Sequence, residues 1–239
     1  MGNDKMRVIG AMTQKGGAGK STLIKALASA AIAGGHSAVL IDADPQQTLL
    51  HWCRDIASDA LKSGKLIVRA VSSAEEAGEL IESYYEAGKT DFIFVDTKGE
   101  GAEWSDRLAP ILDVIVMPIM LSKTDLHIAA QTFGWYNGLK SRVDDPSLLP
   151  PFVAVLNRVK VKSSKGDDEL LAMVVREFPV VETIVLERNA YTEMDRFGLL
   201  GEIATAKAGD ANPLIRTHAK HFLEALQEST DLLNNILAA

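Results

Sequence analysis

The chain has 239 residues, of which 47% are hydrophobic and 24% charged, so it can bury a substantial core without covalent staples. Its formal net charge of −7 excludes a protein that is basic over its whole surface, and nucleic-acid binding would therefore need a local patch. The lone cysteine, Cys53, excludes an internal disulfide and argues against a cysteine-ligated iron–sulfur cluster built by one subunit, which favours a reducing cytoplasm.

Short apolar runs alternate with longer helical patterns along the chain, which is typical of a parallel sheet wrapped by helices. Most of the runs are apolar throughout, as expected for strands covered on both faces. The predicted strands are Met6–Met12, Ala38–Ile41, Leu66–Val71, Phe92–Val95, Val114–Met117, Phe152–Leu156 and Val180–Leu186. The predicted helices are Leu23–Ile32, Thr48–Lys62, Ala74–Ala87, Asp125–Arg142 and Asp167–Phe178.

A last helix is predicted from about residue 212 to residue 237. Asn212 is a suitable N-cap, and Pro213 suits the first helical position. Apolar residues recur at helical spacing and indicate a face packed on the domain: Ile215, Ala219, Phe222, Leu226, Leu233 and Leu237. Because no repeat or linker interrupts the chain, we expect one α/β domain over residues 1–239, with a single doubly wound, mostly parallel sheet flanked by helices.

A glycine-rich segment, TQKGGAGKST at residues 13–22, joins the first predicted strand to the first predicted helix. Its glycines allow the backbone to approach a ligand with successive N–H groups pointing inward. The N-terminus of the following helix adds the positive end of its dipole. Lys20 is placed to reach the outer phosphates of a nucleotide, and the Ser21 hydroxyl to ligate Mg²⁺.

The glycine-rich segment differs from the usual Walker A pattern at Gln14, where that pattern has glycine, and it carries a second lysine, Lys15. This deviant Walker A box resembles that of the ParA/MinD family of P-loop ATPases. The resemblance spans residue 6 to about residue 198, and the chain looks most like the small ParA-type partition proteins. It implies a P-loop ATPase fold and the use of ATP and Mg²⁺.

Carboxylates follow two of the predicted strands, where ligands bind to an open parallel sheet. Asp96 ends one strand in the Walker B arrangement, which holds Mg²⁺ directly or through water. Asp42 and Asp44 follow another strand in a segment that resembles the family's Asp-x-Asp-Pro-Gln switch box. By this resemblance Asp44 orients the attacking water, and Asp42 supports Mg²⁺ and the loop geometry. Lys98 replaces a residue that is often proline in the family.

Two later segments are candidates for contacts with the base. An amide offers both a donor and an acceptor, which match the N6 and N7 edge of adenine, and by resemblance Asn157 recognises adenine. A simple turn asparagine is the alternative. The next residue is Arg158, and the later pair Arg188 and Asn189 is similar to an Arg-Asn segment that flanks the base in the family.

These interpretations define the predicted site. The ATP-binding residues are Lys15, Gly16, Gly17, Ala18, Gly19, Lys20, Ser21, Thr22, Asn157, Arg158, Arg188 and Asn189. The catalytic residues are Lys15, Lys20 and Asp44. The metal ligands are Ser21, Asp42 and Asp96.

Lys15 has a further role in the family that the chain resembles. There, this lysine reaches the partner's phosphates, so that ATP bridges two monomers and hydrolysis releases them. Two lysines from different chains neutralise each triphosphate only in the dimer. The resemblance implies an ATP-bound homodimer and slow hydrolysis stimulated by a cargo or adaptor protein. Alternatively, Lys15 contacts only its own nucleotide or solvent.

ParA-type dimers bind DNA without sequence preference through basic residues near their C-terminal helices. Here Arg216 and Lys220 lie one helical turn apart, and Lys160 and Lys162 belong to a second basic run. Either pair could contact phosphates, although basic residues are also ordinary on a surface. We expect an ATPase that segregates or positions DNA or another cargo in the bacterial cytoplasm, at the nucleoid if it binds DNA.

Three alternatives remain open. A MinD-type ATPase would bind membrane through a basic C-terminal helix, but Ser229–Ala239 has no Lys or Arg, which disfavours membrane binding. A metabolic P-loop ligase would share the fold and need a substrate pocket, whereas Lys15 and the Asp-Pro-Gln box favour a switch. Small ParA relatives also assist conjugative DNA transfer or position protein cargo, and the ATPase core does not separate these roles.

Overall fold

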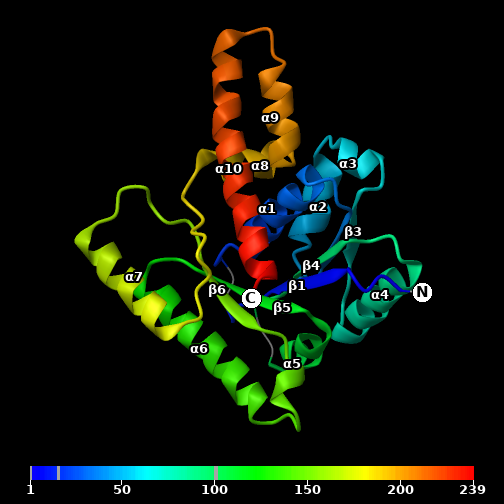
Figure 1. Cartoon of the computed structure of the whole chain (residues 1–239), viewed down its shortest axis with the longest axis vertical. Helices are drawn as coiled ribbons and strands as arrows, with labels where there is room; N and C mark the ends of the chain where they lie inside the picture. The colour runs from blue at the N-terminus through cyan, green and yellow to red at the C-terminus, as the bar shows by residue number, and fades with distance from the viewer. Residues whose placement is uncertain (1, 15–16, 100–101) are drawn as a thin grey trace.

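The computed structural model describes residues 2–14, 17–99 and 102–239, and these contain a six-stranded sheet in the order β3-β2-β4-β1-β5-β6 (Figure 1). Every pair of neighbouring strands is parallel, which confirms the predicted α/β fold. The strands are β1 (Arg7–Ala11), β2 (Ala38–Asp42), β3 (Leu66–Ala70), β4 (Phe92–Asp96), β5 (Val114–Ile119) and β6 (Phe152–Leu156).

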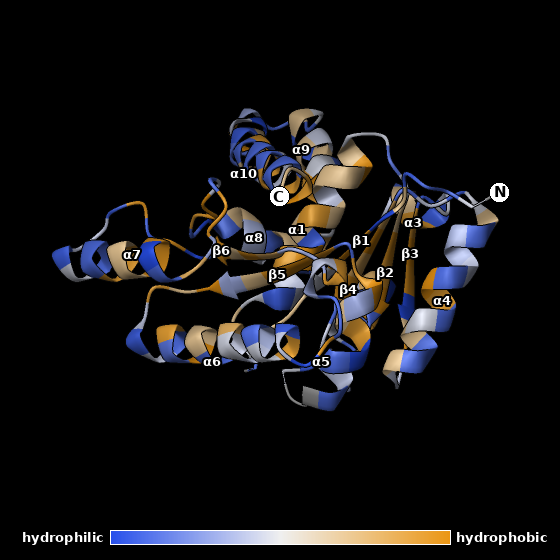
Figure 2. Cartoon of the chain, turned by 60° about the horizontal axis from the view of Figure 1, so that its bottom comes forward, coloured by the Kyte–Doolittle hydropathy of each residue, from blue (hydrophilic) through white to orange (hydrophobic). Residues whose placement is uncertain are grey.

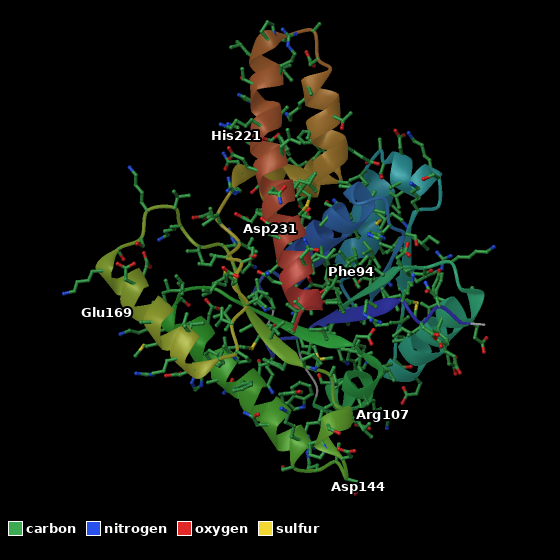
Figure 3. All side chains as sticks on the ribbon, viewed as in Figure 1. Phe94, Arg107, Asp144, Glu169, His221 and Asp231 are labelled. Carbon is green, nitrogen blue, oxygen red and sulfur yellow. The ribbon has the colours of Figure 1, made fainter. Side chains whose placement is uncertain are left out.

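Helices cover both faces of the sheet, and alternate strand residues face each layer (Figure 2). Ile9 and Phe94, the latter labelled in Figure 3, pack in one layer, and Val8 and Ile93 in the other. The first layer contains α1 (Lys20–Ala33), α2 (Thr48–Asp55), α3 (Asp59–Lys62), α8 (Asn189–Phe197), α9 (Leu200–Ala208) and α10 (Pro213–Leu237). The second contains α4 (Ala74–Ala87), α5 (Ala102–Leu108), η1 (Ala109–Ile111), α6 (Lys123–Lys140) and α7 (Lys165–Glu177), and η2 (Pro146–Leu148) precedes β6.

The predicted seventh strand, Val180–Leu186, is wrong. The segment runs beside β6 but makes only isolated bridges at its two ends, Ala154 with Val180 and Val159 with Leu186. Between them, the amide and the hydroxyl of Thr183 both donate to Asn235 Oδ1 on α10, at 3.0 and 2.6 Å. The ladder is interrupted because α10 supplies the hydrogen-bond acceptor in the middle of the segment.

The predicted helix Thr48–Lys62 is two helices, because α2 ends at Asp55 and α3 begins at Asp59. Ser58 lies between them in an extended conformation, and its hydroxyl accepts a hydrogen bond from the amide of Leu61 as the N-cap of α3. The same hydroxyl donates to Glu202 Oε1 on α9, which fixes the break against the rest of the layer.

Helix α10 forms where the sequence predicted it, with Asn212 Oδ1 accepting from the amide of Leu214. Its C-terminal half packs over the sheet, whereas its N-terminal half projects beside α9 beyond the sheet (Figure 1). Most of the predicted apolar stripe is buried, but its two ends, Ile215 and Leu237, are exposed. No helix in the described ranges has the length and apolar character needed to cross a membrane.

Candidate nucleotide site

The glycine-rich segment leads from β1 into α1, with Gly19 as the N-cap of that helix. Gly17 and Gly19 have φ values of 88° and 90°, in the left-handed region that favours glycine. A Cβ atom on Gly19 would also lie 2.3 Å from Asn157 Nδ2, so the close approach of β6 requires glycine there. Lys15 and Gly16 lie outside the described residues.

Asn157 fixes the glycine-rich loop from the carboxyl end of β6. Its side chain is buried, and Nδ2 donates a hydrogen bond of 3.1 Å to the carbonyl oxygen of Ala18. This contact joins the loop to a strand 139 residues away in the sequence. The loop therefore has support from β1, α1 and β6.

Lys20 is almost fully buried, with 6% of the residue exposed. Its Nζ donates to Thr13 Oγ1 at 3.3 Å, so the side chain folds back along the loop toward the end of β1. Burial lowers the pKa of the Lys20 ammonium, and the negative charges of Asp96 and Asp44 oppose this shift. The lysine thus lies within electrostatic reach of both carboxylates.

Asp96 lies at the carboxyl end of β4 and faces the start of α1. Its Oδ2 accepts a hydrogen bond of 2.5 Å from the Ser21 hydroxyl, whereas its buried Oδ1 has no hydrogen-bond partner among the described residues. Burial raises the pKa of Asp96 to about 6, against the opposing effects of the Ser21 hydrogen bond and the Lys20 charge. An unpartnered carboxylate oxygen beside a serine hydroxyl fits a Mg²⁺ ion, which prefers oxygen ligands.

Asp42 is fully buried at the end of β2, and its carboxylate accepts hydrogen bonds from the first turn of α2. Its Oδ2 accepts from the amides of Leu49 and Leu50 at 2.8 and 3.0 Å, and its Oδ1 from the amide of Asp44 at 3.2 Å. Burial raises the pKa of Asp42, and these amides oppose the shift. The carboxylate therefore orders the loop of residues 43–47 and the first turn of α2.

Asp44 is half-buried, and its Oδ1 accepts from the amide of Gln46 at 2.8 Å. Its charge acts on both Lys20 and Asp96, so Asp44 lies near the two groups with which the sequence grouped it. No cluster of three or more His, Cys, Asp or Glu side chains suited to a metal occurs within the described ranges. A Mg²⁺ ion here would need ligands besides carboxylates, such as Ser21 and phosphate oxygens.

A pocket of about 310 Å³ adjoins the start of α1. It is lined by Gly19, Thr22, Asn157, Arg158, Leu186, Glu187, Arg188, Asn189, Tyr191, Thr192 and Asp195. The four residues that the sequence placed beside the base all line this pocket. Tyr191, Thr192 and Asp195 were missed because α8 was not predicted, although their spacing after Arg188 is helical.

Two arginines of the pocket have distinctive geometry. Arg158 has a φ of 55°, an unusual backbone conformation for a non-glycine residue and one that clusters at functional sites. Arg188 donates from Nη1 to Glu224 Oε2 at 3.1 Å and from Nε to Glu228 Oε2 at 3.2 Å. Its guanidinium is therefore committed to α10 while the residue lines the pocket.

The segments that carry the two basic runs of the sequence meet at one pocket. Loop residue Val161, between Lys160 and Lys162, lines a pocket of about 450 Å³ together with His218 and His221 of α10. Figure 3 labels His221 on the projecting half of that helix. Both lysines of the loop are exposed. The loop that carries these lysines thus meets α10 at this pocket, which Glu187 and Glu193 also line.

The basic residues of α10 differ in their contacts. Arg216 donates from Nη1 to the carbonyl oxygens of Asp210 and Ala211, at 2.9 and 3.0 Å, and so closes the turn between α9 and α10. The Lys220 side chain is 79% exposed, and its Nζ lies 3.8 Å from Glu224 Oε1. Lys220 is therefore the more accessible of the two to a ligand.

Comparison with known proteins agrees with this fold. The family model described as VirC1 protein matches residues 6–239. A protein virC1 of Rhizobium radiobacter is 27% identical over 232 residues, covering 94% of this chain and 96% of that protein. A ParA protein of the same organism is 22% identical over 209 residues, covering 87% and 89%.

A solved structure with the same fold is that of cobyrinic acid a,c-diamide synthase from Mycobacterium smegmatis, with bound ADP and magnesium. It has a TM-score of 0.60 and 16% identity, and the similarity covers 85% of this chain and 95% of that one. The family model extends over nearly the whole sequence, from β1 to the end of α10. The chain belongs to the VirC1 family and has the P-loop fold that its resemblance to the ParA/MinD ATPases implied.

Proposed function

We propose that this protein is a ParA-type ATPase in which Mg²⁺-ATP controls dimerisation and DNA binding during DNA partition or transfer. The observation that carries the proposal is the meeting of Lys20, Ser21 and Asp96 at the end of the sheet, where one buried Asp96 oxygen has no partner among the residues that the structure describes. Membership of the VirC1 family, the similarity to a ParA protein, and the ADP and magnesium bound to a protein of the same fold support it.

Different residues of this chain would bind the phosphates, hold Mg²⁺ and orient the attacking water. The backbone N–H groups around Gly17–Ser21, with the N-terminus of α1, would bind phosphates, and Lys20 would neutralise the outer ones. Ser21 and Asp96 would hold Mg²⁺, which when bound offsets the charge of the phosphates. Asp42 keeps the following loop in place, so that Asp44 at the mouth of the site can orient the attacking water.

Dimerisation is the second element of the proposal and depends on Lys15. The triphosphate carries more negative charge than Lys20 alone neutralises, so a second lysine supplied by a partner would stabilise the ATP-bound dimer. We propose that the whole chain acts as one ATPase domain, with α10 packed on it. An adaptor or cargo protein would stimulate hydrolysis.

The DNA-binding surface is the third element and combines Lys160 and Lys162 with Lys220. These side chains are exposed, and Val161 of the same loop lines the 450 Å³ pocket together with His218 and His221 of α10. Arg216 supports the surface by closing the α9–α10 turn. Contacts from two subunits would add, which compensates for the net charge of −7.

Replacing Asp96 by asparagine should stabilise the protein without nucleotide and abolish Mg²⁺-dependent nucleotide binding. The pKa of Asp96 in the folded protein, about 6, exceeds that of an unfolded aspartate, so between about pH 4 and pH 6 the folded state binds more protons than the unfolded state. The protein therefore loses stability as the pH rises through this range. At pH 7 the variant should gain about 1–3 kcal/mol in the free energy of unfolding. Urea unfolding at pH 7 and pH 4.5 with a chelator measures this gain, which should shrink at the lower pH.

Asp144→Asn, which changes an exposed aspartate, is the control for that experiment. A variant Asp96→Asn that is no more stable than this control at pH 7, or that still binds nucleotide more tightly with Mg²⁺, would contradict the assignment of Asp96.

Replacing Asp44 by alanine should preserve ATP binding and slow hydrolysis by about 10²-fold or more, because the attacking water loses its orienting carboxylate. Single-turnover hydrolysis, measured beside ATP affinity, separates the two effects. Asp55→Ala, which removes an exposed carboxylate at the end of α2 and outside the switch box, is a suitable control. Unchanged hydrolysis in Asp44→Ala would mean that another residue orients the water.

Replacing Lys15 by alanine should leave ATP binding within about tenfold of normal and prevent ATP-dependent dimerisation, because each triphosphate loses the partner's lysine. Light scattering with ATP, ADP and no nucleotide measures the mass of the particle. Lys5→Ala, a change outside the glycine-rich loop, is the control. A dimer that forms with ATP in Lys15→Ala would refute the role of Lys15.

Reversing the charge of Lys160, Lys162 and Lys220 to glutamate should reduce ATP-dependent retention on plasmid DNA by at least about tenfold near 0.1 M salt. The matched control reverses the charge of Lys5, Lys65 and Lys89. These lysines are exposed and precede β1, β3 and β4, at the amino ends of the strands and therefore opposite the nucleotide site. Equal retention in the two triple variants would show that net charge alone, and not this surface, governs DNA binding.

A further inference from the structure

A carboxylate that the sequence did not single out faces the nucleotide pocket. Asp195 of α8 lines the pocket together with Gly19 and Thr22, and 67% of its side chain is exposed. Thr192, three residues earlier and therefore on the same side of the helix, lines the pocket as well. This face of α8 presents polar side chains to whatever occupies the pocket.

Asp195 is held in place by a buried lysine. Lys25 Nζ lies 2.5 Å from Asp195 Oδ1, and only 3% of the Lys25 side chain is exposed. The ammonium also lies 5.1 Å from the centre of the Trp52 ring. Burying a charged lysine costs free energy unless the charge is paired. The ion pair with Asp195 offsets this cost for Lys25. The carboxylate remains open to the pocket on its other side.

The pairing fixes the position of Asp195 along the pocket. Thr22 and Lys25 are one turn apart on α1, which separates them by about 4.5 Å along the helix axis. Thr22 lies in the first turn of α1, where phosphates would bind, so Asp195 is close to the phosphate end of the pocket. The first part of a nucleotide beyond its phosphates is the ribose.

We infer that Asp195 accepts hydrogen bonds from the 2′- and 3′-hydroxyl groups of the ribose, so that the site selects ribonucleotides over deoxyribonucleotides. The inference rests on the proposed binding of ATP. An ionised carboxylate can only accept hydrogen bonds, and the two neighbouring hydroxyls are the donors that the ribose offers. Asp195 is a specificity-determining residue, and Lys25 is a positioning residue that acts through it.

Equilibrium titration of the full chain with Mg²⁺ and either ATP or 2′-deoxy-ATP tests the inference. The unmodified protein should bind 2′-deoxy-ATP about tenfold more weakly, as expected for the loss of one hydrogen bond to a charged acceptor. In the double variant Lys25→Met/Asp195→Ala, which leaves no buried charge unpaired, the two affinities should agree within about twofold.

The other lysine–carboxylate pair of α8 supplies the matched control. Lys207 Nζ lies 3.3 Å from Glu193 Oε2 and 5.2 Å from the centre of the Phe222 ring, and neither Lys207 nor Glu193 lines the nucleotide pocket. The variant Lys207→Met/Glu193→Ala should retain the tenfold preference. Thermal unfolding confirms that each variant is folded, and Asp195→Asn, which keeps an oxygen for Lys25, replaces the double variant if that variant does not fold.

Two results would overturn the inference: equal binding of ATP and 2′-deoxy-ATP by the unmodified protein, or an unchanged preference in the Asp195 variants. Failure of the unmodified protein to bind either nucleotide would refute the proposed function itself, together with this inference. The two failures are therefore distinguishable in a single set of titrations.

Discussion

The burial of Asp42 and Asp96 on adjacent strands is the constraint on which the rest of the site depends. The two residues are register partners at the ends of β2 and β4, and each is almost completely buried. Burial raises the pKa of both carboxyl groups, and the charge of Asp42 adds to the rise for Asp96. The contacts of the two residues differ. Asp42 accepts three backbone hydrogen bonds, whereas Asp96 accepts one from the Ser21 hydroxyl, and its Oδ1 has no hydrogen-bond partner in the part of the chain that the structure describes. Asp42 thus orders the loop, and in the function that we propose Asp96 holds the cation.

The helix whose first turn Asp42 holds also contacts α8, on the other side of the site. The amides that it accepts from begin α2, and Trp52 in that helix donates from Nε1 to the carbonyl oxygen of Met194 at 3.0 Å. Met194 belongs to α8, which lines the nucleotide pocket. Helix α2 and the Trp52 indole therefore connect Asp42 with the α8 wall of the pocket.

The residues at strand ends could be predicted from the sequence because every strand of a parallel sheet ends at the same edge. This rule located Asp42, Asp96 and Asn157 before their contacts were known. The partner of Lys25 could not be predicted in this way, because Asp195 is 170 residues distant and lies in a helix whose pattern was missed. The segment Val180–Leu186 has a strand-like composition, but an acceptor 52 residues later replaces its pairing with β6. Local patterns carry no information about such distant partners.

Glu224 lies between the wall of the nucleotide pocket and Lys220, a residue of the proposed DNA-binding surface. Its Oε2 accepts from Arg188 in the pocket wall, and its Oε1 lies 3.8 Å from Lys220 on the exposed side of α10. The pair with Lys220 is largely exposed and contributes at most about 1 kcal/mol, so a phosphate group can displace Glu224 from Lys220 at little cost. The pair with Arg188 is better shielded, and Glu228 reinforces it. Glu224 is therefore held chiefly by Arg188, and the attachment of α10 to the pocket wall does not depend on Lys220.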